Sequence, residues 1–118
     1  MLNEAARYLG TPYVWGGYSP SGFDCSGFVS YCLTNSGVRN TGRLTAQGLY
    51  NICTPVSQSE AQPGDLIFFT GTYDAGEPVT HIGIYVGNGQ MIHCGHPVQY
   101  TSINSPYWQS HFYGFGRW

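Results

Sequence analysis

The sequence predicts an α+β fold in which N-terminal helices pack on a C-terminal antiparallel β-sheet. Two observations indicate this class. Helical spacing of apolar residues is confined to the first half of the chain, whereas short apolar runs bounded by turn residues follow Pro63-Gly64. Elements that occur in separate blocks favour α+β over alternating α/β units. With 118 residues and no repeat, linker or low-complexity tract, residues 1–118 are predicted to form one domain.

Three segments of the first half carry helical signals. Residues 2–9 have apolar side chains at helical spacing, and Gly10 ends the pattern. Residues 25–36 place five apolar side chains on one face, and Asp24 can cap the first turn. Residues 45–52 predict a short third helix.

Four segments of the second half predict strands, and they cover residues 65–70, 80–86, 90–95 and about 111–116. The second and third are separated by Gly-Asn-Gly at 87–89, a strong signal for a β-hairpin. A hairpin here brings the start of the second strand close to the end of the third.

The charge of the chain excludes several classes of partner. Charged residues make up 8%, lysine is absent, and the four arginines are scattered along a chain of net charge −2. A nucleic-acid or anionic-membrane surface requires clustered cations, so neither partner is expected. No apolar run reaches membrane-spanning length. The expected partner is neutral or zwitterionic and rich in hydrogen-bonding groups.

One of four cysteines stands where a nucleophile is needed. Cys25 lies at the predicted start of a helix, after a glycine-containing loop. Unpaired N–H groups at a helix N-terminus favour a thiolate, so we expect the pKa of Cys25 to be lowered there. Cys32, Cys53 and Cys94 are expected to be small core residues without disulfides. Burial as a small hydrophobe is the alternative for Cys25 as well.

Two histidines are suited to act on that cysteine. His81 begins one strand of the predicted hairpin and His93 lies on the other. Their spacing places the two imidazoles close together, so one can act as general base and the other can orient it. A hydrogen-bonded residue in a wall is the alternative for each, and it is preferred for His96 and His111.

A zinc site is a weaker interpretation of the same residues. Cys25, His81, His93, Cys94 and His96 have suitable ligand atoms. Consecutive residues of a strand point to opposite faces, so His93 and Cys94 cannot easily share one metal. Paired spacings such as C-x₂-C are absent. We therefore expect no metal and no cofactor.

Five sequence blocks, in this order, resemble the NlpC-like cell-wall cysteine peptidases. The resemblance extends over nearly the whole chain. The blocks are GTPYVWGG (10–17), FDCSGFV (23–29), QPGDLIFF (62–69), THIGIYVGNG (80–89) and MIH (91–93).

The resemblance implies a papain-like fold and a cysteine endopeptidase that hydrolyses amide bonds in peptidoglycan stem peptides. The typical bond joins D-γ-glutamate, or its amidated form, to the following diamino acid. By the match, Cys25 is the nucleophile, His81 the general base and His93 the orienting residue. The hydroxyl of Tyr13 and the N–H of Cys25 would hold the oxyanion.

The resemblance also implies substrate contacts. Asp24, Ser26 and Trp15 fall at substrate-lining positions, and in family members specific for a free N-terminal L-alanine the aspartate meets its ammonium. A helix cap is the alternative for Asp24, and a core aromatic residue the alternative for Tyr13 and Trp15. The family often has Arg-Thr or Arg-Ser before its third helix, but Leu44-Thr45 follows Arg43 here, so no contact is carried over to Arg43.

Two further segments have structural interpretations. Asp65 is expected to be a turn or strand-start residue rather than a catalytic acid. The insert at 72–78 is either a wall of the cleft or a solvated loop.

We therefore expect a monomeric peptidoglycan endopeptidase, excised from a longer multidomain secreted protein and acting at the cell wall. The same Cys-His scaffold also suits an amidase or acyltransferase. A non-catalytic wall-binding module is a third possibility, although such a module does not need a cysteine at a helix tip facing two histidines.

Overall fold

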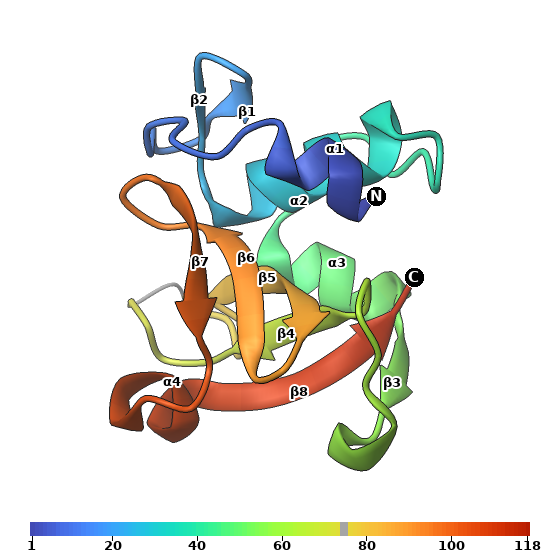
Figure 1. Ribbon diagram of the computed structural model, residues 1–118, viewed down its shortest axis with the longest axis vertical. Helices are drawn as coiled ribbons and strands as arrows, with labels where there is room; N and C mark the ends of the chain where they lie inside the picture. Colours follow the sequence, from blue (N-terminus) through green and yellow to red (C-terminus); the bar gives the residue numbers. More distant parts are fainter. Residues whose placement is uncertain (74–75) are drawn as a thin grey trace.

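The computed structural model describes residues 1–73 and 76–118 (Figure 1). It confirms the α+β class and the packing of N-terminal helices on an antiparallel sheet. The helices are α1 (Leu2–Ala6), α2 (Cys25–Asn35), α3 (Ala46–Ile52) and α4 (Pro106–His111), with one 3₁₀ turn at Gln58–Glu60.

The sheet has six strands in the order β3-β8-β4-β5-β6-β7, and every neighbouring pair is antiparallel. A separate two-stranded hairpin precedes α2. The strands are β1 (Tyr18–Ser19), β2 (Gly22–Phe23), β3 (Thr54–Val56), β4 (Leu66–Phe69), β5 (His81–Gly87), β6 (Gln90–Cys94), β7 (Val98–Ser102) and β8 (Phe112–Arg117).

The first helix is shorter than the predicted segment 2–9. After Ala6 the N–H groups of Tyr8 and Leu9 donate to carbonyls three residues back instead of four, at 3.1 and 3.4 Å. The chain tightens and leaves the helix in this way. Leu9 is consequently exposed rather than buried on the expected face.

Helix α2 is the buried centre of the molecule. The Asp24 side chain accepts a hydrogen bond from the N–H of Gly27 at 2.7 Å, so the expected helix cap is present. The face predicted from residues 25–36 is buried against β5 and β6. This face consists of Cys25, Phe28, Val29, Cys32 and Leu33.

The loop before α2 approaches the helix closely because residue 27 has no side chain. A Cβ on Gly27 would lie 1.9 Å from the carbonyl oxygen of Gly17 and 2.9 Å from Oδ1 of Asp24. The loop can therefore rest directly on the first turn of α2. This contact places residues 13–17 beside the helix tip.

The sheet has an apolar cluster on each face. One cluster lies between the sheet and α2, and the other is built from Ile67, Phe69, Met91, Ile103 and Phe115. Asp65 is buried at the start of β4, and its carboxylate accepts hydrogen bonds from Nε and Nη2 of Arg117 at 2.7 and 2.8 Å. This ion pair confirms the structural interpretation of Asp65.

Of the described helices, none has the length and apolar character needed to cross a membrane.

Candidate active site

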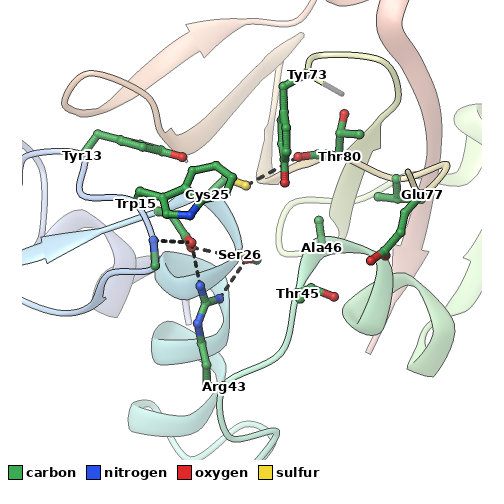
Figure 2. A pocket seen from close by; sticks show the side chains of 13 residues that line it. Tyr13, Trp15, Cys25, Ser26, Arg43, Thr45, Ala46, Tyr73, Glu77 and Thr80 are labelled. Atoms are coloured by element: carbon green, nitrogen blue, oxygen red, sulfur yellow. Dashed lines mark hydrogen bonds and ion pairs between the residues drawn. The ribbon is translucent and has the colours of Figure 1, made fainter. Parts of the chain in front are cut away.

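Cys25 is the first residue of α2 and lies against the start of β5. Its Sγ donates to the carbonyl of Thr80 at 3.9 Å. As the first helical residue, its N–H has no partner within the helix. Figure 2 shows the thiol between Tyr13 and Tyr73, at the floor of an open cavity.

The pKa of this thiol does not move in the expected direction. Burial raises the pKa of Cys25 to about 11, and the Asp24 carboxylate acts in the same direction. The backbone N–H groups of Ile82 and Ser26 lower the pKa, but by less. The prediction of a helix-lowered pKa is therefore wrong, because desolvation of the thiol outweighs the effect of the helix terminus. Cys25 rests as a neutral thiol and needs a base.

The structure brings the two predicted histidines together. Nε2 of His81 lies 2.9 Å from Nδ1 of His93, and both imidazoles line the same cavity as Cys25. The two residues are diagonal across the β5–β6 hairpin. Room for this contact comes from Gly83, where a Cβ would lie 3.2 Å from the Cβ of His93.

Both imidazoles are neutral near pH 7. Burial lowers the pKa of His81 to about 3, and the neighbouring His93 acts in the same direction. Burial alone lowers the pKa of His93 to about 4. A neutral imidazole can accept a proton, so His81 is in the state that a general base requires.

A residue that sequence reasoning missed completes this chain of side chains. Oγ1 of Thr101, on β7, lies 2.9 Å from Nε2 of His93. A series of hydrogen bonds therefore connects His81 to His93 and His93 to Thr101. No motif marks Thr101, and only the β6–β7 pairing brings it to the site.

Tyr13 is held by backbone contacts to β2. It forms a parallel bridge with Phe23, and the N–H of Val14 donates to the Phe23 carbonyl at 2.9 Å. Its ring lies against His96 with centres 4.7 Å apart. Burial, followed by the nearby Cys25, raises the pKa of Tyr13 to about 12. The phenol stays protonated and can donate a hydrogen bond.

A cavity of about 410 Å³ opens on one side of Cys25. Trp15 is 72% exposed at its edge, which contradicts the alternative of a core aromatic residue. Its ring meets Tyr73 edge to face, with ring centres 5.4 Å apart. Tyr73 and Glu77, from the insert at 72–78, also line the cavity (Figure 2). The described part of that insert is thus a cleft wall, and Asp74 and Ala75 lie outside the described residues.

The floor of this cavity carries a compact polar network. Oδ1 of Asp24 accepts from Gly27 and, at 3.3 Å, from the hydroxyl of Ser26. Oδ2 of Asp24 accepts from the N–H of Gly16 at 3.0 Å and from Arg43 at 2.6 Å. Arg43 also donates to the Ser26 hydroxyl at 2.8 Å. Arg43 therefore belongs to the cavity, although the sequence resemblance did not extend to it.

A second cavity, of about 280 Å³, opens on the histidine side of Cys25. Its wall includes Tyr107 and Trp108 of α4, together with His96. Neither aromatic residue was expected at the site, because the sequence did not predict α4. No carboxylate lines this cavity among the residues that the structure describes.

Among the remaining cysteines and histidines, Cys94 and His111 are held by hydrogen bonds to backbone carbonyls. All four cysteines carry free thiols, and Cys94 donates to the carbonyl of Phe23 at 3.1 Å. Nδ1 of His111 lies 2.7 Å from the carbonyl of Thr70. Within residues 1–73 and 76–118, no group of three or more His, Cys, Asp and Glu side chains is arranged to hold a metal ion.

Known proteins are similar to this chain in sequence and in fold. The model of the NlpC/P60 family matches residues 10–117. The bifunctional muramidase/DL-endopeptidase CwlT of Bacillus subtilis is 44% identical over 119 residues, which cover 99% of this chain and 35% of that protein. The murein DD-endopeptidase MepH of Escherichia coli is 40% identical over 126 residues, covering 98% of this chain and 44% of that protein.

A solved structure of the same family has the same fold. The crystal structure of a Staphylococcus aureus protein, described as similar to lipoprotein, NLP/P60 family, superposes with a TM-score of 0.93. It is 44% identical, and the match covers 98% of this chain and 39% of that one. The chain thus spans less than half of each of these relatives. The match over nearly all its length shows that it belongs to the NlpC/P60 family.

Proposed function

We propose that this domain is a cysteine endopeptidase that hydrolyses amide bonds in peptidoglycan stem peptides. The observation that carries the proposal is the placement of Cys25 at a helix tip, in one cavity with a hydrogen-bonded pair of neutral histidines. A wall-binding module has no need of this arrangement. The endopeptidase names of two relatives support the same reaction.

In the first step the thiol proton moves to His81 while Sγ bonds to the carbonyl carbon of the substrate. Nε2 of His81 is engaged by His93, so Nδ1 is the nitrogen that remains for the proton. The carbonyl π pair moves onto oxygen and gives an oxyanion. The N–H of Cys25 and the hydroxyl of Tyr13 are the donors proposed to hold it.

In the second step the C–N bond breaks as the imidazolium of His81 gives its proton to the leaving amine. A thioester on Cys25 remains. Water then attacks this thioester while His81 takes a proton from the water, and the C–S bond breaks. The imidazolium returns that proton to the thiolate of Cys25, and the acyl product leaves as a carboxylate after its acid proton passes to solvent.

This chemistry assigns a side to each half of the substrate. The leaving amine must reach His81, so we assign the leaving group to the cavity with Tyr107 and Trp108. The acyl half then lies in the larger cavity, where Asp24 and Ser26 form the floor and Trp15 stands at the edge. These three residues are the proposed substrate contacts on the acyl side.

The proposed scissile bond joins D-γ-glutamate, or its amide, to the following diamino acid, which is a bond of the DL type. The relatives differ on this point, since one is named a DL-endopeptidase and the other a DD-endopeptidase. We propose action at the cell wall, outside the cytoplasm, as a monomeric domain of a longer secreted protein.

The test is digestion of purified peptidoglycan, with the fragments identified by mass spectrometry. We expect fragments ending in γ-D-glutamate or its amide, paired with fragments that begin at the diamino acid. Cys25→Ala should abolish their release. Cys53→Ala is the matched control, since the Cys53 thiol lines neither of these cavities.

Three results would count against the proposal. Fragments produced by cleavage between two D-amino acids would reject the DL bond as the scissile bond, but they would still support a peptidase. Undiminished activity in Cys25→Ala would reject the nucleophile, and loss of activity with EDTA but not with iodoacetamide would favour a metal enzyme. If no fragments were released from peptidoglycans that differ in the diamino acid of the stem peptide, the amidase or the binding module would be favoured.

A further inference from the structure

The indole of Trp108 stacks on the imidazole of His81 in an inclined arrangement. The ring centres are 5.2 Å apart and the planes are inclined by 29°. The same indole meets His93 edge-on, with centres 5.3 Å apart and planes at 86°. One side chain therefore contacts both histidines of the hydrogen-bonded pair.

Two contacts hold the indole in this position. The backbone N–H of Trp108 donates to the side chain of Ser105, the cap of α4, at 3.4 Å. The ring packs on Phe69 of β4 with centres 4.7 Å apart. Trp108 is thus fixed from the helix cap and from the sheet, and it belongs to the apolar cluster on that face.

The stacking restricts rotation of the His81 imidazole. With one face covered by the indole and Nε2 bonded to His93, the imidazole cannot rotate freely about its side-chain bonds. Nδ1 is therefore kept in a single direction.

The stacking matters more once the imidazole carries a charge. In the proposed first step the proton leaves Sγ of Cys25 and binds Nδ1 of His81, which gives an imidazolium. Among the residues that the structure describes, no carboxylate lines this cavity. The electron-rich face of an indole attracts a cation, and tryptophan is the strongest aromatic residue in this respect.

We propose that Trp108 is a positioning residue that fixes the plane of His81 and stabilises its protonated form during proton transfer from Cys25. The inference rests on the proposed roles of Cys25 and His81. The interaction strengthens only when the imidazolium forms, so it acts on the chemical step rather than on substrate binding.

The test compares Trp108→Phe and Trp108→Leu in the whole domain. Phenylalanine keeps an aromatic face beside His81, although its quadrupole is weaker. Leucine keeps only an apolar side chain at this position. We expect kcat on a stem peptide to fall about 2- to 5-fold in the first variant and about 5- to 30-fold in the second, with KM within 2-fold of the wild type. Alkylation of Cys25 by iodoacetamide, measured without substrate, should slow by similar factors.

The controls separate positioning from other roles. Trp118→Phe removes a tryptophan that lines neither cavity, and it should change neither rate. In a His81→Ala background, Trp108→Leu should have no further effect on alkylation, because the two residues act as a unit. Thermal unfolding monitors the fold of every variant.

A raised KM with unchanged kcat and alkylation would overturn the inference and make Trp108 a wall of the leaving-group cavity. An equal effect of Trp108→Leu with and without His81 would also overturn it. Wild-type alkylation and hydrolysis in His81→Ala would instead reject the role of His81 on which the inference rests, and release of no peptidoglycan fragments by the wild type would reject the proposed function. The two failures are therefore distinguishable.

Discussion

His93 hydrogen-bonds to His81 through Nδ1, which lies 2.9 Å from Nε2 of His81. If Nδ1 of His81 is to accept a proton, the hydrogen of its neutral ring must be on Nε2, and His93 must accept it. The hydrogen of His93 is then on Nε2, which donates to the hydroxyl of Thr101 at 2.9 Å. The Thr101 hydroxyl can therefore serve as the acceptor for the tautomer of both rings that the proposed base requires.

We expect Thr101→Val to lower kcat about 3- to 10-fold with little change in KM, because valine has the same shape but cannot accept a hydrogen bond. Thr101→Ser keeps the hydroxyl and should stay close to the wild type. Steady-state kinetics on a stem peptide measure both. Equal activity of the valine and serine variants would show that the tautomer does not depend on this contact.

Replacing Gly27 should disturb the loop that carries Tyr13 and Trp15. The new Cβ of Gly27→Ala would lie 1.9 Å from the Gly17 carbonyl oxygen, so the loop must move away from α2. We expect a loss of about 1 to 3 kcal/mol in the free energy of unfolding, together with a fall in activity.

Urea unfolding of Gly27→Ala is best compared with that of Gly48→Ala. The Cβ of the latter meets only side chains, the nearest being Oγ1 of Thr45 at 3.3 Å, and residue 48 is helical. Its stability should stay within about 1 kcal/mol of the wild type. Similar losses in both variants would mean that the close approach at Gly17 does not constrain the loop.

The parts of the fold that could be predicted are those with long, regular apolar patterns. Helix α2 and the strands β4 and β6 bury all or nearly all of their apolar residues, and β5 buries Ile82 and Ile84, so their spacing is visible in the sequence. Strands β3 and β7 lie at the two edges of the sheet and are half polar, which removes that signal. Helix α4 has six residues, too few for a helical period, although Ser105 and Pro106 carry its start signals.

The candidate site divides in the same way. Cys25, His81 and His93 lie on elements with clear patterns, so their proximity could be inferred. Thr101 and Trp108 lie on elements that were not predicted, and only the folded chain brings them to the histidines. The pKa of Cys25 was misjudged for a different reason: a helix terminus is visible in sequence, but the extent of burial is not.

The Asp24 carboxylate has no free position for a substrate ammonium. Its two oxygens accept four hydrogen bonds, from Gly27, Ser26, Gly16 and Arg43, which is the full capacity of a carboxylate. Arg43 also offsets its charge. We therefore expect stem peptides with an acylated N-terminal alanine to be cleaved at least as well as those with a free amine.

Arg43→Gln should shift this preference toward the free amine, by about 3- to 10-fold in the ratio of kcat/KM values, because one acceptor position on Oδ2 of Asp24 is released and its negative charge is no longer offset by Arg43. The measurement uses a pair of stem peptides that differ only in N-acetylation. Arg39→Gln is a control, since Arg39 is exposed and hydrogen-bonds to the Ile52 carbonyl instead. A wild-type enzyme that requires the free amine would contradict the prediction.

The stability of the domain should fall as the pH is lowered from about 6.5 to about 4.5. Burial lowers the pKa of His81 to about 3 and that of His93 to about 4, whereas an unfolded histidine titrates near 6.5. In this window the unfolded chain binds protons that these two folded residues do not, so protonation favours unfolding. Each such proton gives a slope of up to about 1.4 kcal/mol per pH unit.

Urea unfolding at pH 7.5, about 6 and about 4.5 measures that slope, and the carboxylates that begin to titrate at the lowest pH are common to the two proteins compared. His93→Gln keeps a hydrogen-bonding side chain but removes one titrating ring. It should therefore show a smaller loss of stability over the same interval than the wild type does. If the two proteins lost stability in parallel, His93 would have to be protonated equally in the folded and unfolded states, and the neutral histidine pair on which the proposed base depends would be rejected.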